Sequence, residues 1–382
     1  QQAKNNGVES FVLFSNSPLV QFTKNGQGRS DNGAYANLKD ECYGSFADYM
    51  AQVAAHFIAD GYNISHISPV NEPQYNWDGH NQEGSGWQNA EVARLATALD
   101  KSLTREGLDT KILLSEAASW EYVYGGDKER QNTIDAFFNP SSAAYVGDLA
   151  HVDKVMAGHS YWTNTPVEYM RECREALRDT LRKYGVDFWQ SEVCIMGNDE
   201  EIGGGGGYDR TMKTALYVAR MIHHDLVHAD ARTWQWWRSV GGDYKDGLLF
   251  QYREPGAPND TIVDSKLLWA LGNYSRFIRP GAVRLNVADQ NAQEATDPWG
   301  LMCSAFRNAD GQDVVVVINY ADTDATTSIR GLYDGSWTAY RTSDAEGESL
   351  KPVAQLKNLI NLTIPKRSIT TFLSKTQNQS NL

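Results

Sequence analysis

The stretch ISHISPVNEPQYNWDGHNQEGSGW, residues 64–87, decides how this chain is organised. It begins as a short strand with apolar, β-branched residues at 64, 67 and 70. It then ends in Asn71, Glu72 and Pro73, because proline has no N–H to continue a sheet ladder. We therefore expect Glu72 at the C-terminal tip of a strand. In a barrel of parallel strands, active sites are built at those tips.

The loop after this strand is rich in groups that suit sugars. Aromatic rings can stack on the apolar faces of pyranose rings, and amides and carboxylates can hydrogen-bond the hydroxyl groups. The candidate sugar contacts are Gln74, Tyr75, Asn76, Trp77, Gln82, Glu83 and Trp87. The alternative interpretation is a solvated glutamate at a strand end, followed by ordinary loop aromatics.

Strands and helices alternate through the first two thirds of the chain. Apolar runs and β-branched residues predict strands, and 3.6-residue periodicity predicts helices. The predicted strands are 11–14, 64–70, 110–115, 155–161, 186–189 and 231–237, and the predicted helices are 43–60, 90–106, 166–184 and 211–225. Six strands that alternate with helices are typical of a parallel α/β architecture.

Polar and aromatic side chains follow each of these strands. In chain order they are Asn16, Asn71 and Glu72, Glu116 and Trp120, His159, Tyr161 and Trp162, Glu192, and Trp234 and Trp236. If Glu72 and Glu192 lie on facing strands of a barrel, they meet across its mouth, as two-carboxylate glycoside hydrolysis requires. One would act as a protonated acid and the other as an ionised nucleophile. Two unrelated carboxylates are the alternative.

From about residue 279 the pattern changes to short strands separated by turns. The predicted strands are 283–287, 301–307, 314–320, 326–329, 337–342 and 361–372. No helix is predicted between them, which is typical of an antiparallel sandwich. We therefore expect a catalytic domain over residues 1–278 and a β-sandwich side domain over residues 279–382.

Composition limits the possible partners. The net charge of −13 over 382 residues disfavours nucleic acid, whose phosphates need a basic surface, and an anionic membrane. No apolar run reaches membrane length. The four cysteines show no CxxC or Cys/His spacing, so a zinc site is not expected.

Several motifs together resemble glycoside hydrolase family 30. They are FSNSP at 14–18, ISPVNEPQ at 67–74, QEGS at 82–85, WQSE ending at Glu192, and YSRFIRPG at 274–281. Their order spans most of the chain, and the loop at 71–87 is most similar to the endo-β-1,6-galactanase branch. The resemblance implies a (β/α)8 TIM barrel with a C-terminal side β-sandwich, and a retaining mechanism without a metal or an organic cofactor.

The resemblance also implies roles for individual residues. Glu72 would be the acid/base and Glu192 the nucleophile. Asn71 would hydrogen-bond the sugar 2-hydroxyl, and Tyr161, which follows His159, would hydrogen-bond the nucleophile. Trp236 would be a sugar platform. The expected substrate-binding set is Asn16, Asn71, Trp77, Gln82, Glu83, His159, Tyr161 and Trp236. Core packing is the alternative for Tyr161 and Trp236.

One departure from the family pattern concerns the N-terminal region. Only seven residues precede Val8, whereas the family's barrel has two strands and two helices before the FSNSP strand. We therefore expect a barrel that lacks its first two βα units, including the second-strand arginine usually found beneath the nucleophile. An open sheet leaves unpaired edges, so our hypothesis is an N-terminally truncated fragment.

The expected activity is cleavage of β-1,6-linked galactan by a secreted or extracytoplasmic monomer whose partner is a polysaccharide or oligosaccharide. Other specificities of the family remain open: β-1,6-glucanase, glucuronoxylanase and exo-β-1,6-galactobiohydrolase. A non-catalytic glycan-binding protein is the alternative from another class.

Overall fold

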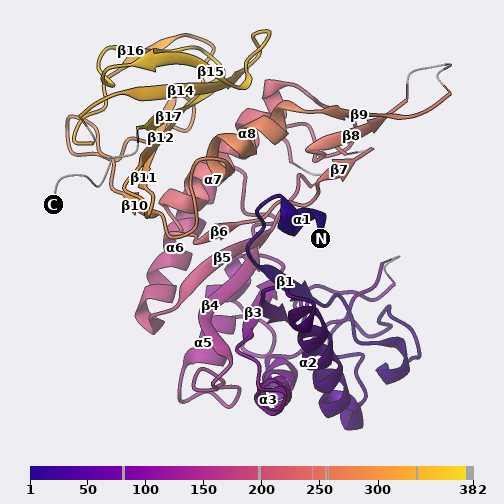
Figure 1. The fold of residues 1–382 in the computed structure, drawn as a ribbon. Helices are drawn as coiled ribbons and strands as arrows, with labels where there is room; N and C mark the ends of the chain where they lie inside the picture. Colours follow the sequence, from indigo (N-terminus) through magenta and orange to yellow (C-terminus); the bar gives the residue numbers. More distant parts are fainter. Residues whose placement is uncertain are drawn as a thin grey trace. The chain divides into compact units, whose positions relative to one another are not determined.

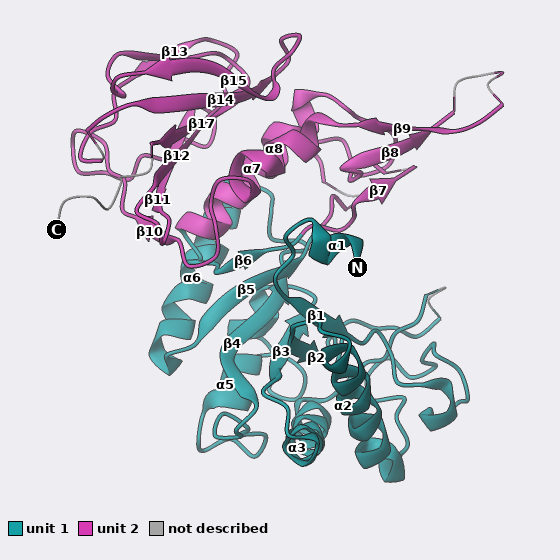
Figure 2. Cartoon of the chain, viewed as in Figure 1, with its two compact units in different colours: residues 1–193, 228–235 teal, residues 194–227, 236–382 magenta. Residues whose placement is uncertain are grey.

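The computed structural model describes most of the chain as two compact units, which Figure 2 colours separately. Unit 1 comprises residues 1–193 and 228–235, and unit 2 comprises residues 194–227 and 236–382. The described residues are 1–79, 82–196, 199–242, 244–253, 256, 258–332 and 334–375.

Unit 1 is built on one parallel sheet with the strand order β1-β2-β3-β4-β5-β6 (Figure 1). Its strands are β1 (Phe11–Phe14), β2 (Ile64–Ser68), β3 (Lys111–Ala117), β4 (Val152–His159), β5 (Asp187–Glu192) and β6 (Thr233–Trp234). Every neighbouring pair is parallel. The predicted parallel α/β architecture is confirmed. Within the described residues the sheet is a curled, open part of a barrel, with β1 and β6 at its edges.

Three long helices of unit 1 lie where periodicity predicts them. They are α2 (Tyr43–Ala59), α3 (Asn89–Glu106) and α6 (Val167–Tyr184). A capping box between Gln88 and Glu91 starts α3, and the left-handed Gly107 ends it. The short helices α1 (Gln2–Asn5), α4 (Glu121–Tyr124) and α5 (Thr133–Phe138) and the 3₁₀ turns η1 (Val20–Phe22) and η2 (Asp40–Cys42) were not predicted, because one turn carries little periodicity.

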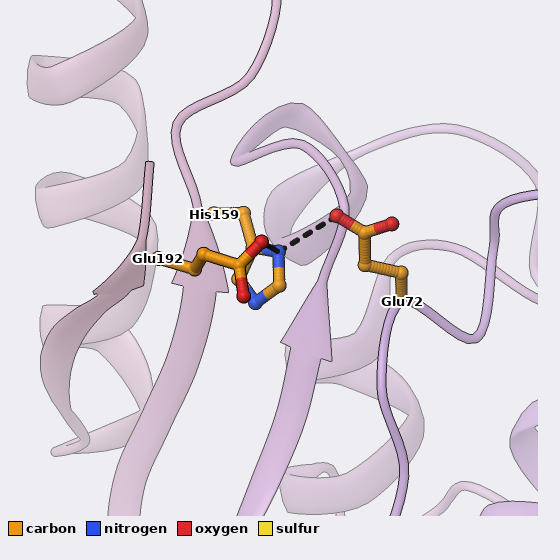
Figure 3. A group of neighbouring side chains, drawn as sticks. All are labelled: Glu72, His159 and Glu192. Carbon is orange, nitrogen blue, oxygen red and sulfur yellow. Dashed lines mark hydrogen bonds and ion pairs between the residues drawn. The ribbon is translucent and has the colours of Figure 1, made fainter. Parts of the chain in front are cut away.

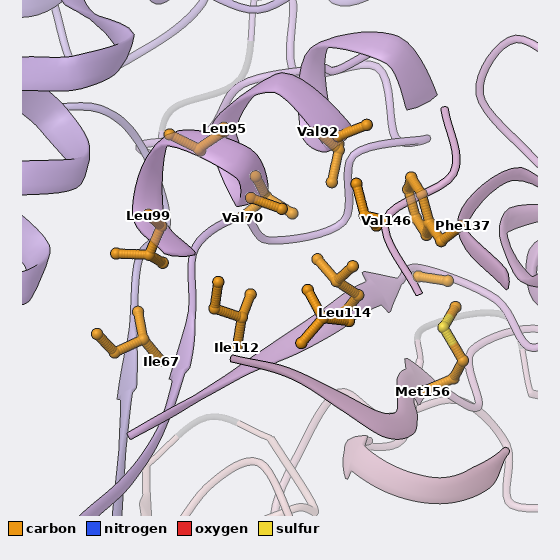
Figure 4. Close-up of a cluster of buried hydrophobic side chains, with 14 of the residues drawn as sticks. Ile67, Val70, Val92, Leu95, Leu99, Ile112, Leu114, Phe137, Val146 and Met156 are labelled. Carbon is orange, nitrogen blue, oxygen red and sulfur yellow. The ribbon is translucent and has the colours of Figure 1, made fainter. Parts of the chain in front are cut away.

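The main core of unit 1 lies between the sheet and these helices (Figure 4). Ile112 and Leu114 of β3 contribute to it, together with Leu95 and Leu99 of α3. Leu113, between the two β3 residues, belongs instead to a smaller cluster with Val155. This alternation places the two β3 faces in different environments, as the two-residue period of a strand requires. Packing on both faces of the sheet thus holds the strands rigidly below their C-terminal ends.

Two strands of the sheet carry register shifts near their C-terminal ends. In β3, Ser115 pairs with Ala157 and Ala117 with Gly158, so Glu116 is passed over by the ladder. In β5, Gln190 pairs with Gly158 and Glu192 with His159, so Ser191 is passed over. Bulges of this kind re-aim a side chain and often lie next to active sites.

Unit 2 contains an antiparallel sheet with the order β10-β11-β12-β17-β14-β15. Its strands are β10 (Val283–Leu285), β11 (Leu301–Arg307), β12 (Asp313–Asn319), β14 (Trp337–Ser343), β15 (Ser349–Leu356) and β17 (Ser368–Ser374). A second small sheet pairs β13 (Ala325–Thr327) with β16 (Leu362–Ile364), and a buried apolar cluster joins the two sheets. The predicted side sandwich is confirmed.

Strand β15 was not predicted, and the single predicted strand 361–372 is in fact two, β16 and β17. Residue Pro352 lies within β15, opposite Tyr340 of β14. Proline is tolerated there because β15 is the outermost strand of its sheet, where no further ladder needs its N–H.

Unit 2 also includes elements that we had assigned to the catalytic domain. They are α7 (Met212–Val227), β7 (Val240–Gly241), β8 (Leu249–Tyr252), β9 (Thr261–Asp264) and α8 (Lys266–Ser275). The α8 residue Asn273 donates to Thr342 Oγ1 of β14 at 2.7 Å and accepts a hydrogen bond from Thr371 of β17. These buried bonds explain why compactness groups α8 with the C-terminal sheet. The expected boundary between a catalytic domain and a β-sandwich after residue 278 stays a prediction.

No helix in the described part of the chain is both long enough and apolar enough to cross a membrane.

Candidate active site

Three side chains from the strand tips of unit 1 converge on one point: Glu72, His159 and Glu192 (Figure 3). His159 is fully buried at the end of β4, and its Nδ1 lies 2.8 Å from Glu72 Oε1 and 3.8 Å from Glu192 Oε1. One oxygen of each glutamate lies within 4.8 Å of the other and of the imidazole. The two predicted catalytic carboxylates are therefore brought together, with a histidine between them.

The backbone around Glu72 fixes the direction of its carboxylate. Glu72 has a φ of 42°, which a residue with a Cβ rarely adopts. Its N–H donates to Glu116 O at 2.9 Å, and its own carbonyl accepts the indole N–H of Trp77 at 3.1 Å. Such a conformation persists only where its surroundings hold it, and it is typical of functional sites.

Glu192 is held by Tyr161, as predicted for the nucleophile's partner. The Tyr161 hydroxyl donates to Glu192 Oε1 at 2.9 Å. Burial raises the pKa of Glu192 above its usual value; the charge on His159 lowers it, and the charge on Glu72 raises it. The nucleophile candidate is thus a partly desolvated carboxylate.

The carboxylates around His159 offset the effect of burial on its pKa. Burial alone would lower its pKa, but Glu116 and Glu72 next to its ring, together with the charge on Glu192, raise the pKa of His159 to about 10. The Nε2 atom lies 3.4 Å from Glu116 Oε2. Both ring nitrogens therefore face carboxylates, which is a proton-sharing arrangement, and we do not assign the cluster as a metal centre.

Buried polar atoms without a protein partner lie beside the acid/base candidate. Among the described residues, Asn71 Oδ1 and both side-chain amide atoms of Gln74 are buried and lack a hydrogen bond. Buried amides that the protein leaves unpaired are well suited to a ligand's hydroxyl groups. The sugar contact expected of Asn71 stays a prediction, and its unpaired Oδ1 is free to make one.

The remaining predicted contacts are more dispersed. Trp77 is buried, and its indole N–H donates a hydrogen bond to Glu72 O. This suits support of the Glu72 backbone better than stacking on a sugar. Asn16, Gln82 and Glu83 are exposed on loops of unit 1. Trp236 belongs to unit 2, where its indole donates to Asp246 O at 2.7 Å.

An exposed pair of aromatic rings is formed by residues that lie close in sequence to the site residues. The Trp162 side chain follows Tyr161, is 39% exposed and lies nearly parallel to Tyr75, with ring centroids 6.2 Å apart. Parallel aromatic faces that reach solvent are suited to stacking on sugar rings.

The main feature that sequence reasoning missed is the role of Glu116. Its position at a strand tip is visible in the sequence, but the bulge that turns its carboxylate toward His159 is not.

Comparison with protein families agrees with this geometry. Residues 1–250 match the model of O-glycosyl hydrolase family 30, and residues 281–372 match the glycosyl hydrolase family 30 β-sandwich domain.

Individual relatives carry the names of different activities. The chain is 24% identical over 347 residues to the glucuronoxylanase XynC of Bacillus subtilis, covering 88% of this chain and 67% of that protein. It is 24% identical over 305 residues to the endo-β-1,6-galactanase of Hypocrea rufa, covering 78% of this chain and 54% of that protein.

Solved structures share the fold. A conserved exported protein from Bacteroides fragilis is 28% identical, with a TM-score of 0.87 over 97% of this chain and 77% of that one. The catalytic domain of the GH30 xylanase C from Talaromyces cellulolyticus is 20% identical, with a TM-score of 0.74 over 98% of this chain and 78% of that one. Both family models match, and the first covers more than half of this chain. The chain therefore belongs to glycoside hydrolase family 30.

Proposed function

We propose that this glycoside hydrolase is an endo-β-1,6-galactanase that acts outside the cytoplasm with retention of anomeric configuration. One observation carries the mechanism: carboxylate oxygens of Glu72 and Glu192 lie within 4.8 Å of each other. Carboxylate oxygens this close fit a retaining pair better than an inverting pair, whose carboxyl groups lie about 6.5–9.5 Å apart to leave room for a water.

The mechanism runs in two steps. Glu192 attacks the anomeric carbon while the bond to the leaving oxygen breaks, and Glu72 supplies the proton to that oxygen. In the second step Glu72 takes a proton from water, which attacks the anomeric carbon and releases Glu192 as a carboxylate. Tyr161, bonded to Glu192 Oε1, supports the carboxylate before attack and after release.

The galactan assignment rests on the loop at residues 71–87 and on the similarity to the Hypocrea rufa enzyme. Extracytoplasmic action is part of the same proposal, because an enzyme can cleave a polysaccharide outside the cell only if it is itself outside the cytoplasm. Glucuronoxylan is the second candidate substrate, since the similarity to the Bacillus subtilis enzyme extends over a larger share of this chain.

The test is reducing-sugar release from de-arabinosylated β-1,6-galactan, glucuronoxylan and β-1,6-glucan. We expect release from galactan, loss of that release in Glu192→Gln, and full activity in the control Glu9→Gln, which alters an exposed glutamate of the same unit. Release from glucuronoxylan alone would support the second candidate. Binding of galactan without release from any polymer would indicate a glycan-binding protein and contradict the proposal.

A further inference from the structure

A third glutamate beside the two catalytic candidates has no part in the two-carboxylate mechanism. Glu116 is 1% exposed, and its Oε2 lies 3.4 Å from His159 Nε2, on the opposite side of the imidazole from Glu72. A carboxylate is costly to bury unless it is paired, so its partners indicate what it does.

The sheet holds Glu116 firmly across several strands. Ser68 of β2 donates to Glu116 Oε1 at 2.7 Å, and Ser191 of β5 donates to Oε2. Glu116 has a φ of 51°, and both Glu116 and Ser191 are the residues that the ladder passes over. Two bulges on either side of β4 therefore place one carboxylate against the buried ring of His159.

The contact between Glu116 Oε2 and His159 Nε2 is an ion pair at 3.4 Å without hydrogen-bond geometry, so Glu116 acts on the ring through its charge. A carboxylate that accepts two hydroxyl bonds acts as an acceptor only, so it favours a proton on Nε2. Nδ1, 2.8 Å from Glu72 Oε1, then either holds a second proton or accepts one from Glu72. These two atoms are close enough to share one proton.

We propose that Glu116 is a positioning residue that fixes a proton on His159 Nε2, so that Nδ1 and Glu72 together hold the proton delivered to the leaving oxygen. In the first step that proton moves to the leaving oxygen as its bond to carbon breaks. In the second step a proton from the attacking water restores the pair. The proposal rests on the acid/base role of Glu72.

The charges around His159 agree with this arrangement. Glu72, Glu116 and Glu192 face the ring from the tips of β2, β3 and β5, and Tyr161 contacts it at a centroid distance of 5.8 Å. Burial opposes a charge on the ring, but the three carboxylates outweigh it and raise the pKa of His159 to about 10. Without the Glu116 charge the pair would lose its proton at a lower pH.

A purely structural role is the competing explanation, because Glu116 also ties β2 to β5. The Glu116→Gln variant separates the two, since it keeps the shape and removes the charge. Ser68→Ala is the matched control, because it removes a buried bond to Glu116 Oε1 but leaves the Oε2 contact with His159. We expect both variants to lower the melting temperature.

The discriminating measurement is kcat/KM, which reports the first step alone, on two aryl β-1,6-galactobiosides, one with 2,4-dinitrophenol and one with 4-methylphenol as leaving group. Protonation matters only for the poor leaving group. We expect Glu116→Gln to slow the 4-methylphenyl substrate about 100-fold and the dinitrophenyl substrate within about threefold. The basic limb of its pH profile should move to lower pH. Ser68→Ala should leave the ratio of the two rates as in the wild type.

Two further readouts close the test. In a His159→Asn background, Glu116→Gln should cause no additional loss, because it acts through the ring. In the proton NMR spectrum, a downfield imidazole N–H resonance that is lost in His159→Asn should move in Glu116→Gln. Equal slowing of both substrates with an unmoved pH profile would overturn the inference. A wild type inactive on both substrates would instead contradict the proposed function, and the NMR shift would still test the Glu116 contact.

Discussion

At the residue scale, the partly buried carboxylate of Glu192, the nucleophile candidate, lowers the stability of the folded protein at neutral pH. Burial raises the pKa of Glu192, so the folded state favours the protonated carboxyl. Its contribution to stability is present at low pH and is lost as the pH rises through the raised pKa.

We therefore expect Glu192→Gln, which cannot ionise, to raise the melting temperature at pH 7, by roughly 1 °C for each kcal/mol gained in a chain of 382 residues. Differential scanning calorimetry at pH 7 and pH 4 measures it, and the gain should shrink at pH 4. Glu9→Gln is the control, with no change expected. A destabilised Glu192→Gln at pH 7 would contradict this account of the site.

Tyr161 gives a second prediction at this scale. Its hydroxyl bond favours the ionised form of Glu192 and lowers the pKa of that carboxyl. Tyr161→Phe should therefore move the acid limb of the kcat/KM profile to higher pH and reduce kcat about tenfold, since a hydrogen bond to a charged group contributes about 1.5–3 kcal/mol. An unchanged acid limb would show that the hydroxyl does not influence the nucleophile.

At the element scale, α3 shows how one cap supports a loop as well as a helix. Glu91 Oε2 accepts the N–H of Gln88 at 2.8 Å, which closes the capping box, and the N–H of Ala36 at 3.0 Å. Glu91→Ala should cost about 1–2 kcal/mol of unfolding free energy, the range of a lost N-terminal cap. Urea unfolding measures the loss. Glu106→Ala, at the exposed last residue of the same helix, should cost nothing comparable.

An element can be predicted from the sequence when the residue pattern that specifies it lies within the element itself. The strands of unit 1 and the helices α2, α3 and α6 were predictable, because burial on one face leaves a periodic pattern. The positions of Glu72 and Glu192 at strand tips follow from the same pattern. The register shifts at Glu116 and Ser191 depend on how neighbouring strands pair, so a single sequence does not reveal them. For the same reason, the buried state of Trp77 was not predictable from its place in a polar loop.

At the scale of the whole molecule, the division by compactness differs from the division by the pattern of predicted helices and strands. The change to short strands after residue 279 is real, and the β-sandwich family model begins at residue 281. By compactness, residues 194–227 and 236–382 form unit 2, and the bonds of Asn273 to β14 and β17 explain why α8 is part of it. Bonds between residues far apart in the sequence leave no mark in composition, which explains the difference.

The net charge of −13 distinguishes the candidate substrates. Glucuronoxylan carries carboxylates and β-1,6-galactan does not, so only the former is repelled by an acidic protein. Salt screens such repulsion over a Debye length of about 10 Å at 0.1 M. We therefore expect kcat/KM on galactan to stay constant between about 0.02 and 0.5 M NaCl, and any activity on glucuronoxylan to rise over the same range. Reducing-sugar release on both polymers at several salt concentrations measures this. Glucuronoxylan hydrolysis that falls steadily with salt would reveal a local basic site for the uronic acid, and would favour that polymer as the natural substrate.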